Sequence, residues 1–208
     1  EAVARVGRIE WPVHMTESVR DLLRGISEAT GVELDPDDLP TTLARLGPMA
    51  TLVGATLQNT ANPTMLSAGY KHNVIPGEAI AHVDCRFLPG YEEELLARID
   101  EALGEHVVRE EHIADIAVET TFDGASIDLM AAALRAEDPG ARTVPYMLSG
   151  GTDAKAFSTL GIRCYGFAPL KLPPALNFGA LFHGVDERVP LDALHFGTRV
   201  LDRFLRAA

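Results

Sequence analysis

Hydrophobic residues recur every three or four positions in several stretches of the chain, the spacing that gives a helix one buried stripe. A glycine or a proline follows most of these stretches and marks where each helix ends. In the last stretch we expect Leu194, Leu201, Phe204 and Leu205 to face inward. The predicted helices cover residues 1–8, 16–31, part of 35–48, 91–103, 127–134, a short segment before Gly161, and 190–208.

Other stretches alternate between apolar and polar residues or form short apolar runs, and these predict β-strands. The clearest strand covers residues 78–87, where Asp84 and Arg86 lie on the polar face and only Ile80 breaks the alternation. The other predicted strands or extended segments cover residues 51–69, 106–112, 118–121, 143–147 and 162–167.

The order of these elements changes near residues 113–117. Before that point the pattern predicts an antiparallel sheet with helices, and after it strands and helices alternate as in an α/β layer sandwich. The fold class is therefore predicted as α/β, with one module over residues 1–114 and a second over 115–208. A length of 208 residues fits this division, since a domain usually has roughly 100–200 residues.

Composition and charge narrow the choice of partners. The chain is 47% hydrophobic and 23% charged, which is typical of a folded protein rather than a disordered one. Its net charge of −12 gives a mean field that repels phosphate. We therefore expect no nucleic-acid partner and no anionic membrane surface.

The two cysteines and the start of the chain indicate a cellular setting. Cys85 and Cys164 lie in separate apolar runs, so we expect free, unreactive thiols and a cytoplasmic location. No apolar run approaches the roughly 20 residues of a membrane span. The chain opens inside a predicted helix and without a methionine, so we expect it to be part of a longer protein.

A glycine-rich turn follows the predicted strand over 143–147. It reads Ser149-Gly150-Gly151-Thr152-Asp153 and leads into a short helix. Two glycines allow a ligand close to the backbone, and a helix start offers N–H donors. The alternative is a tight turn in which Thr152 or Asp153 caps the helix, and the spacing by itself favours that alternative.

Three further residues stand in positions that suit chemistry. His183 lies in a glycine-containing loop beside Asp186 and Glu187, so it is a candidate metal ligand or general base, or simply a loop histidine. Arg86 suits a carboxylate clamp, or it forms an ion pair with Asp84 on the same strand face. Asn73 precedes a Pro-Gly turn and is a candidate ligand contact or a turn residue.

The other histidines have no partner at metal-ligand spacing. We expect them to be surface residues or hydrogen-bonded core residues. They are His14, His82, His106, His112 and His195.

Three segments together resemble a known family. They are NVIPGEAIAHVDCRFLPG at 73–90, SGGTDAKAF at 149–157 and FHGVDERVP at 182–190. In this order and spacing they resemble the dizinc metallopeptidases and amidohydrolases that include aminoacylase, carboxypeptidase G, acetylornithine deacetylase and succinyl-diaminopimelate desuccinylase. The resemblance covers essentially the whole chain.

The resemblance implies a domain assignment and a role for each motif residue. Residues 1–114 would be a lid or dimerisation domain without its first strand, with a four-stranded antiparallel sheet and helices on one face. Residues 115–208 would be the C-terminal segment of the catalytic domain. The implied roles are zinc ligand for His183, substrate binding for Asn73, Arg86, Gly150, Gly151 and Thr152, and orientation of the loop and the histidine for Asp153 and Glu187.

The resemblance also implies what this chain lacks. The family's other zinc ligands, its glutamate general base and a lid histidine match no residue here, and His72 stands where an apolar residue is common. One histidine cannot hold the two zinc ions of a complete site, because each ion needs about four ligands. We therefore expect the chain alone to be inactive, and the whole protein to be a homodimer joined through the lid.

The resulting expectation is zinc-dependent hydrolysis of an amide bond in an N-acyl amino acid or small peptide with a free carboxylate. One alternative is a non-catalytic dimerisation or ligand-binding module of the same ancestry. A weaker alternative is a small-molecule regulatory domain, which would need neither the glycine-rich loop nor His183.

Overall fold

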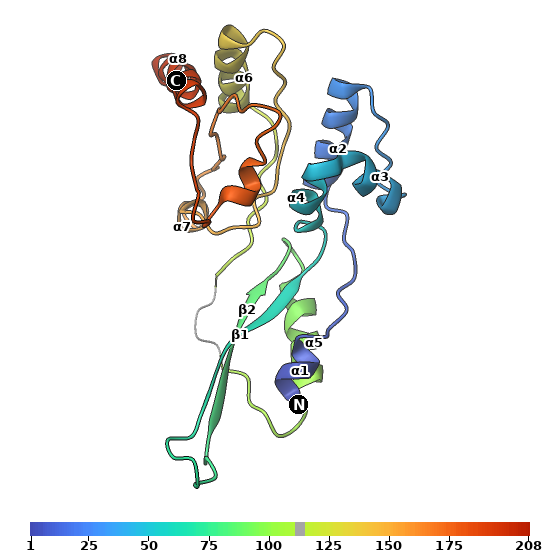
Figure 1. The fold of residues 1–208 in the computed structure, drawn as a ribbon. Coiled ribbons are helices and arrows are strands. Elements are labelled where there is room, and N and C mark those ends of the chain that lie inside the picture. Colours follow the sequence, from blue (N-terminus) through green and yellow to red (C-terminus); the bar gives the residue numbers. More distant parts are fainter. Residues whose placement is uncertain (111–114) are drawn as a thin grey trace.

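The computed structural model describes residues 1–110 and 115–208. Helices and one small antiparallel sheet form three groups in space (Figure 1). The elements are α1 (Ala2–Val6), α2 (Glu17–Thr30), α3 (Leu39–Leu46), η1 (Gly47–Met49), α4 (Ala50–Gly54), β1 (Thr60–Ala68), β2 (Ala79–Arg86), α5 (Glu92–Leu103), α6 (Ala125–Glu137), α7 (Ala154–Ser158), η2 (Phe178–Leu181) and α8 (Leu191–Ala207).

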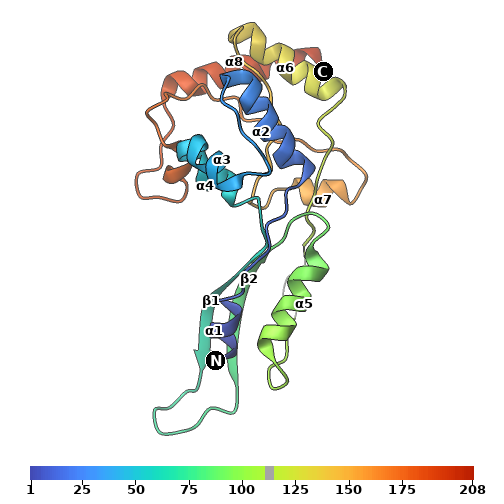
Figure 2. The same cartoon turned by 90° about the vertical axis from the view of Figure 1, so that its right-hand side faces the viewer.

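The first group, here called the hairpin unit, consists of β1, β2, α1 and α5. The two strands pair antiparallel from Thr60–Arg86 at one end to Ala68–Ala79 at the other. The short helix α1 contacts both β1 and α5, and the hairpin continues past the helices to an exposed tip (Figures 1 and 2). Its buried core is small and consists of Val6, Ala61, Leu95 and Ile99.

An arginine fastens the two helices of the hairpin unit together. The guanidinium of Arg5 donates hydrogen bonds to the carbonyls of Ala102 and Leu103, at 2.6 and 2.9 Å. These carbonyls belong to the last turn of α5, which leaves them without a partner inside the helix. A cation there is also favoured by the helix dipole.

The second group, here called the helical unit, consists of α2, η1, α3 and α4. Its core is formed by Val19, Leu22, Leu23, Leu34, Leu46, Val53 and Leu57. Val144, from far along the chain, also packs against this core. The helical unit is therefore in contact with the C-terminal segment, although its residues lie within the range predicted as the lid.

The third group is the C-terminal segment, residues 115–208. Here α6 packs against α8 through Ala133, Phe196 and Val200. Glu137 at the end of α6 binds both Arg199 and Arg203 of α8, at 2.7 and 2.6 Å. The combination of helices with an antiparallel sheet confirms the predicted mixed class.

Most predicted helices are confirmed, and so is the strand over 78–87. Several predicted strands are wrong for the residues that the structure describes. Among the described residues, no other strand pairs with the segments 106–110, 118–121, 143–147 and 162–167. The remaining residues of the strand predicted over 106–112, which include His112, lie outside the described residues. The sheet therefore has two described strands rather than the four that the resemblance implies.

The physical reason is that β-propensity does not supply a pairing partner. Residues 162–167 are instead held by side chains: Tyr165 donates to the carbonyls of Thr121 and Asp123, and Arg163 pairs with Asp123 at 3.0 Å. In the segment 143–147, Pro145 also lacks an N–H for a ladder.

Two further expectations need correction. The stretch 51–69 is extended only from Thr60, because Val53 and Leu57 turn inward with α4 to complete the core of the helical unit. In α8, the face turned toward α6 carries Phe196 and Val200, with Phe204 packed beside them. The predicted inward residues Leu194, Leu201 and Leu205 are exposed.

The helices of the structure can be compared with the length and apolarity that a membrane span requires. Among the described residues, every helix is too short or too polar to pass through a bilayer.

Candidate functional site

Arg86 is the candidate residue with the most contacts. It ends β2 at the base of the hairpin, on the strand face that also carries Asp84. Its Nε and Nη2 donate to the two carboxylate oxygens of Asp84, at 3.1 and 3.4 Å. Its Nη1 donates to the carbonyl oxygen of Ser149 at 2.7 Å, across 63 positions in sequence. The hairpin therefore contacts the glycine-rich turn through the guanidinium of Arg86.

The glycine-rich turn is exposed from Ser149 to Asp153 and leads into α7. A Cβ at Gly151 would meet nothing within 4 Å, so the turn presents bare backbone to open space. Asp153 occupies the position before α7, but its side chain makes no capping hydrogen bond. The turn therefore places Asp153 at the N-cap position, as the alternative predicts, but without a side-chain capping bond.

An open cavity joins these two features. Arg86, Ser149, Gly150, Gly151 and Thr152 line it, together with parts of β2 and α5. Its volume is about 2280 Å³, well above the ~300–1,000 Å³ of a formed small-molecule pocket. The cavity marks a region between the hairpin and the C-terminal segment rather than a shaped binding site.

His183 lies in a separate loop between η2 and α8 and is exposed. Its backbone has φ of 59°, a conformation that residues other than glycine seldom adopt. Its backbone N–H donates to Oε2 of Glu187 at 3.3 Å, which holds the loop closed over four residues. Such local strain is typical of positions that present a side chain for function.

The loop of His183 is supported by the helical unit. A Cβ placed on Gly179, within η2, would lie 3.6 Å from Leu52 of α4. Phe178 and Phe182 meet edge to face on either side of that glycine, with ring centroids 5.0 Å apart. The helical unit therefore contacts both this loop and, through Val144, the strand-like segment before the glycine-rich turn.

Asn73 lies at the opposite end of the hairpin from Arg86. It occupies an exposed turn at the tip, where the N–H of Val74 donates to the carbonyl of Lys71 at 3.2 Å. The eight residues of β2 separate the tip from Arg86, a distance of about 23 Å at roughly 3.3 Å per residue. Within one chain these two candidate residues are far apart.

The described residues do not form a complete metal centre. His183 and Glu187 supply one imidazole and one carboxylate, and a zinc ion needs about four ligands. No group of three or more potential metal-ligating side chains comes together within residues 1–110 and 115–208. The donors present fit one ligand position of a zinc site and not the whole site.

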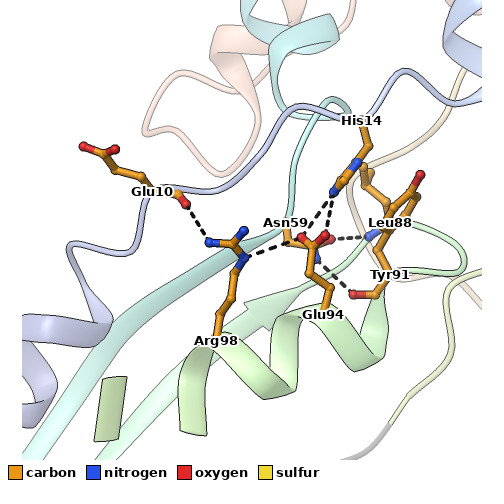
Figure 3. A network of polar contacts seen from close by, with 7 residues as sticks. All are labelled: Glu10, His14, Asn59, Leu88, Tyr91, Glu94 and Arg98. Carbon is orange, nitrogen blue, oxygen red and sulfur yellow. Dashed lines mark hydrogen bonds and ion pairs between the residues drawn. The ribbon is translucent and has the colours of Figure 1, made fainter. Parts of the chain in front are cut away.

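Sequence reasoning missed a polar network at the top of the hairpin unit (Figure 3). The ring of His14 stacks on Tyr91 at 3.8 Å, and its Nε2 lies 3.1 Å from a carboxylate oxygen of Glu94. Asn59 is fully buried, accepts from the N–H of Leu88 at 2.9 Å and donates to the carbonyl of Tyr91 at 3.0 Å. The expectation that His14 is a hydrogen-bonded residue is confirmed.

This network fixes the start of α5 to the segment that enters the hairpin. The sequence signal was a polar Asn59 within the extended segment predicted over 51–69, which is too common to point to a buried amide. The network is structural, since Asn59 binds two backbone groups through its amide and the His14 ring faces the carboxylate of Glu94.

The environment of Cys85 bears on reactivity. Burial, and then the negative charge of Asp84, raise the pKa of the Cys85 thiol above its ordinary value. The thiol is therefore protonated near neutral pH and a poor nucleophile. Both cysteines are free, as the sequence predicts, although the Cys85 residue is exposed rather than enclosed.

Comparison with known proteins places these features in context. Residues 33–111 match the peptidase dimerisation domain of the M20 type. The chain is 27% identical over 196 residues to succinyl-diaminopimelate desuccinylase of Bordetella avium, covering 90% of this chain and 45% of that protein. It is 28% identical over 137 residues to acetylornithine deacetylase of Myxococcus xanthus, covering 65% of this chain and 34% of that protein.

A solved structure shares the fold. An M20 family metallo-carboxypeptidase from Sulfolobus solfataricus superposes with a TM-score of 0.55 at 16% identity, covering 99% of this chain and 50% of that one. This chain spans less than half the length of the curated relatives it matches. The comparisons confirm the resemblance: residues 33–111 match an M20-type peptidase dimerisation domain, and the chain is similar to a desuccinylase and a deacetylase.

Proposed function

We propose that the complete protein is a cytoplasmic, zinc-dependent hydrolase. It cleaves an amide bond in an N-acyl amino acid or small peptide that has a free carboxylate. The relatives named as a desuccinylase and a deacetylase support a deacylase. The single observation that carries the proposal is the 2.7 Å hydrogen bond from Arg86 to Ser149, which joins two motif segments 63 positions apart beside one cavity.

In this proposal the residues of the chain bind and orient the substrate. Arg86 binds the free carboxylate, because a guanidinium fork matches a carboxylate in shape and charge. The backbone of Gly150, Gly151 and Thr152 lines the bound substrate. His183 supplies one ligand to a pair of zinc ions, with Glu187 holding its loop and Asp153 orienting the glycine-rich turn. Zinc supplies a water of lowered pKa when bound, and the remaining ligands come from outside the described residues.

The position of Asn73 leads to a proposal about assembly. Asn73 and Arg86 lie at opposite ends of β2, too far apart to grip one small substrate within a single chain. We propose a homodimer formed through the hairpin unit, in which Asn73 of the partner subunit reaches the site that contains Arg86. A dimerisation domain over residues 33–111 supports this assembly.

Activity of the complete protein is the first test. Purified protein loaded with zinc or cobalt is assayed on a panel of N-acyl amino acids and dipeptides. We expect hydrolysis of at least one class, and loss of it in His183→Ala. The matched control is His195→Ala on the exposed face of α8, which keeps activity. Failure to hydrolyse any substrate of the panel would refute the proposal and favour a non-catalytic ligand-binding module.

Mixing two inactive variants tests the shared site. Asn73→Ala and Arg86→Ala proteins are combined, dissociated and allowed to reassemble. If the residues act from different subunits, half the dimers carry one intact site, and activity recovers to about a quarter of wild type. If both residues act from the same subunit, the mixture stays inactive and the assembly proposal is wrong.

A further inference from the structure

Asp84 and Arg86 lie two positions apart on the same face of β2. Their side chains are 43% and 56% exposed, so neither is held in place by burial. The strand fixes both backbones through the ladder with β1, where Asp84 is opposite Asn62 and Arg86 is opposite Thr60. Two side chains on a rigid strand therefore meet in one defined geometry.

The contact uses one particular edge of the guanidinium. Asp84 accepts from Nε and Nη2 together, at 3.1 and 3.4 Å, which is a side-on, two-point arrangement. Nη1 donates to the carbonyl of Ser149 at 2.7 Å. With the side edge occupied, each terminal nitrogen keeps one further N–H, and that of Nη2 lies on the end edge of the fork.

We propose that Asp84 is a positioning residue that directs the end edge of the Arg86 guanidinium toward a substrate carboxylate beside the glycine-rich turn. The inference rests on the proposed function, because it assigns the orientation of the arginine that the function requires. A free arginine side chain samples many rotamers, and ordering it on binding weakens affinity. Asp84 removes that freedom before the substrate arrives.

A purely structural role predicts something different. An exposed ion pair adds little to stability, so its loss would leave substrate binding unchanged or would lower activity toward every substrate alike. A purely electrostatic role predicts the opposite sign, because removing the negative charge of Asp84 would tighten the binding of an anionic substrate. A positioning role predicts weaker binding of carboxylates alone.

The experiment compares a matched pair of ligands in the complete protein. The pair is the best N-acyl amino acid substrate and the same molecule with its carboxylate replaced by a carboxamide. We measure kcat and KM for both, and where turnover is too slow we measure Kd by calorimetry. For Asp84→Ala we expect KM or Kd for the carboxylate to rise about tenfold, with kcat and carboxamide binding unchanged. Asp84→Asn keeps one oxygen acceptor and restores part of the loss.

Two controls separate the possible failures. Asp202→Ala breaks the exposed ion pair with Arg206 on α8 and leaves both ligands unaffected. Arg86→Ala removes the preference for the carboxylate altogether. If Arg86→Ala keeps that preference, the proposed function is wrong. If Arg86→Ala removes it while Asp84→Ala leaves it unchanged, improves it, or weakens both ligands equally, only the role of Asp84 is overturned.

Discussion

The hairpin unit and the C-terminal segment reach their structures in different ways. In the hairpin unit, neighbouring strands pair with each other, and one helix covers them through Leu95 and Ile99. In the C-terminal segment the helices α6 and α8 pair, but the strand-like segments around them have no ladder partner among the described residues. Apolar side chains there stay exposed, including Leu148, Leu160 and Ile162.

The difference shows how far local pattern determines structure. The strands of a hairpin find their partners close by in sequence, from Ala68–Ala79 to Thr60–Arg86 here, so alternation in sequence is enough to specify them. A strand whose neighbour is distant in sequence needs that neighbour to be present before it becomes a strand. The four predictions below test this contrast, beginning with the largest expected effect.

Leu95→Ala removes a 2%-exposed side chain from the centre of the hairpin unit. We expect the free energy of unfolding to fall by about 2–5 kcal/mol, because the mutation leaves a cavity that the two helices cannot close. Urea unfolding followed by circular dichroism measures the loss, and hydrogen exchange in α5 locates it. If the amides of α5 are equally protected from hydrogen exchange in the variant and the wild type, Leu95 does not stabilise a core within the hairpin unit.

Asn59→Ala leaves two backbone groups of the hairpin unit without this partner, the buried N–H of Leu88 and the partly buried carbonyl of Tyr91. The expected destabilisation is about 1–3 kcal/mol, the cost of an unsatisfied buried group. Asn62→Ala, on the exposed part of β1, is the matched control and changes stability little. A similar loss in both variants would show that Asn59 acts through the strand and not through its hydrogen bonds.

Glu137→Gln tests the α6–α8 pair of the C-terminal segment through pH. Hydrogen bonds from Arg199 and then Arg203 hold the pKa of Glu137 below its ordinary value of 4.5. A carboxyl whose folded pKa is lowered stabilises the fold above its unfolded pKa, and this stabilisation is lost as pH falls through the folded pKa.

We therefore expect the melting temperature of the wild type to drop more steeply below pH 4.5 than that of Glu137→Gln, with the variant less stable at neutral pH. Thermal unfolding monitored between pH 3 and 7, at roughly unit steps, measures this. Glu101→Gln on the exposed face of α5 keeps the wild-type profile. Parallel curves for wild type and Glu137→Gln would rule out a stabilising contact at this position.

Leu205→Ala gives the smallest expected effect. The residue is 70% exposed on the face of α8 that points away from α6, so we expect a change within about 0.5 kcal/mol. The same leucine-to-alanine substitution at Leu95 is expected to lower the free energy of unfolding several times more. Urea unfolding of both variants compares the two regions directly. A loss at Leu205 equal to that at Leu95 would mean that this face of α8 is covered.

The sequence located most of the candidate site and little of its geometry. The strand over 78–87 and its alternation placed Asp84 and Arg86 on one face, which the structure confirms. No sequence pattern indicated that Arg86 contacts Ser149, because that contact depends on how the hairpin meets a turn 63 positions away. The predicted inward face of α8 was wrong because two apolar stripes compete on that helix, one of leucines and one with Phe196, Val200 and Phe204. Only packing against α6 selects between them.

By itself the sequence determined the elements that are stabilised within short stretches of chain: the amphipathic helices and the strand over 78–87. It also determined the resemblance carried by the three motifs, because motif order is a property of sequence. The tertiary structure decided which faces are buried, which predicted strands find partners, and that Asn73 and Arg86 lie at opposite ends of one strand. The physical reason is that burial and strand pairing are interactions between segments distant in sequence. The local pattern of one segment does not specify which other segment it will contact.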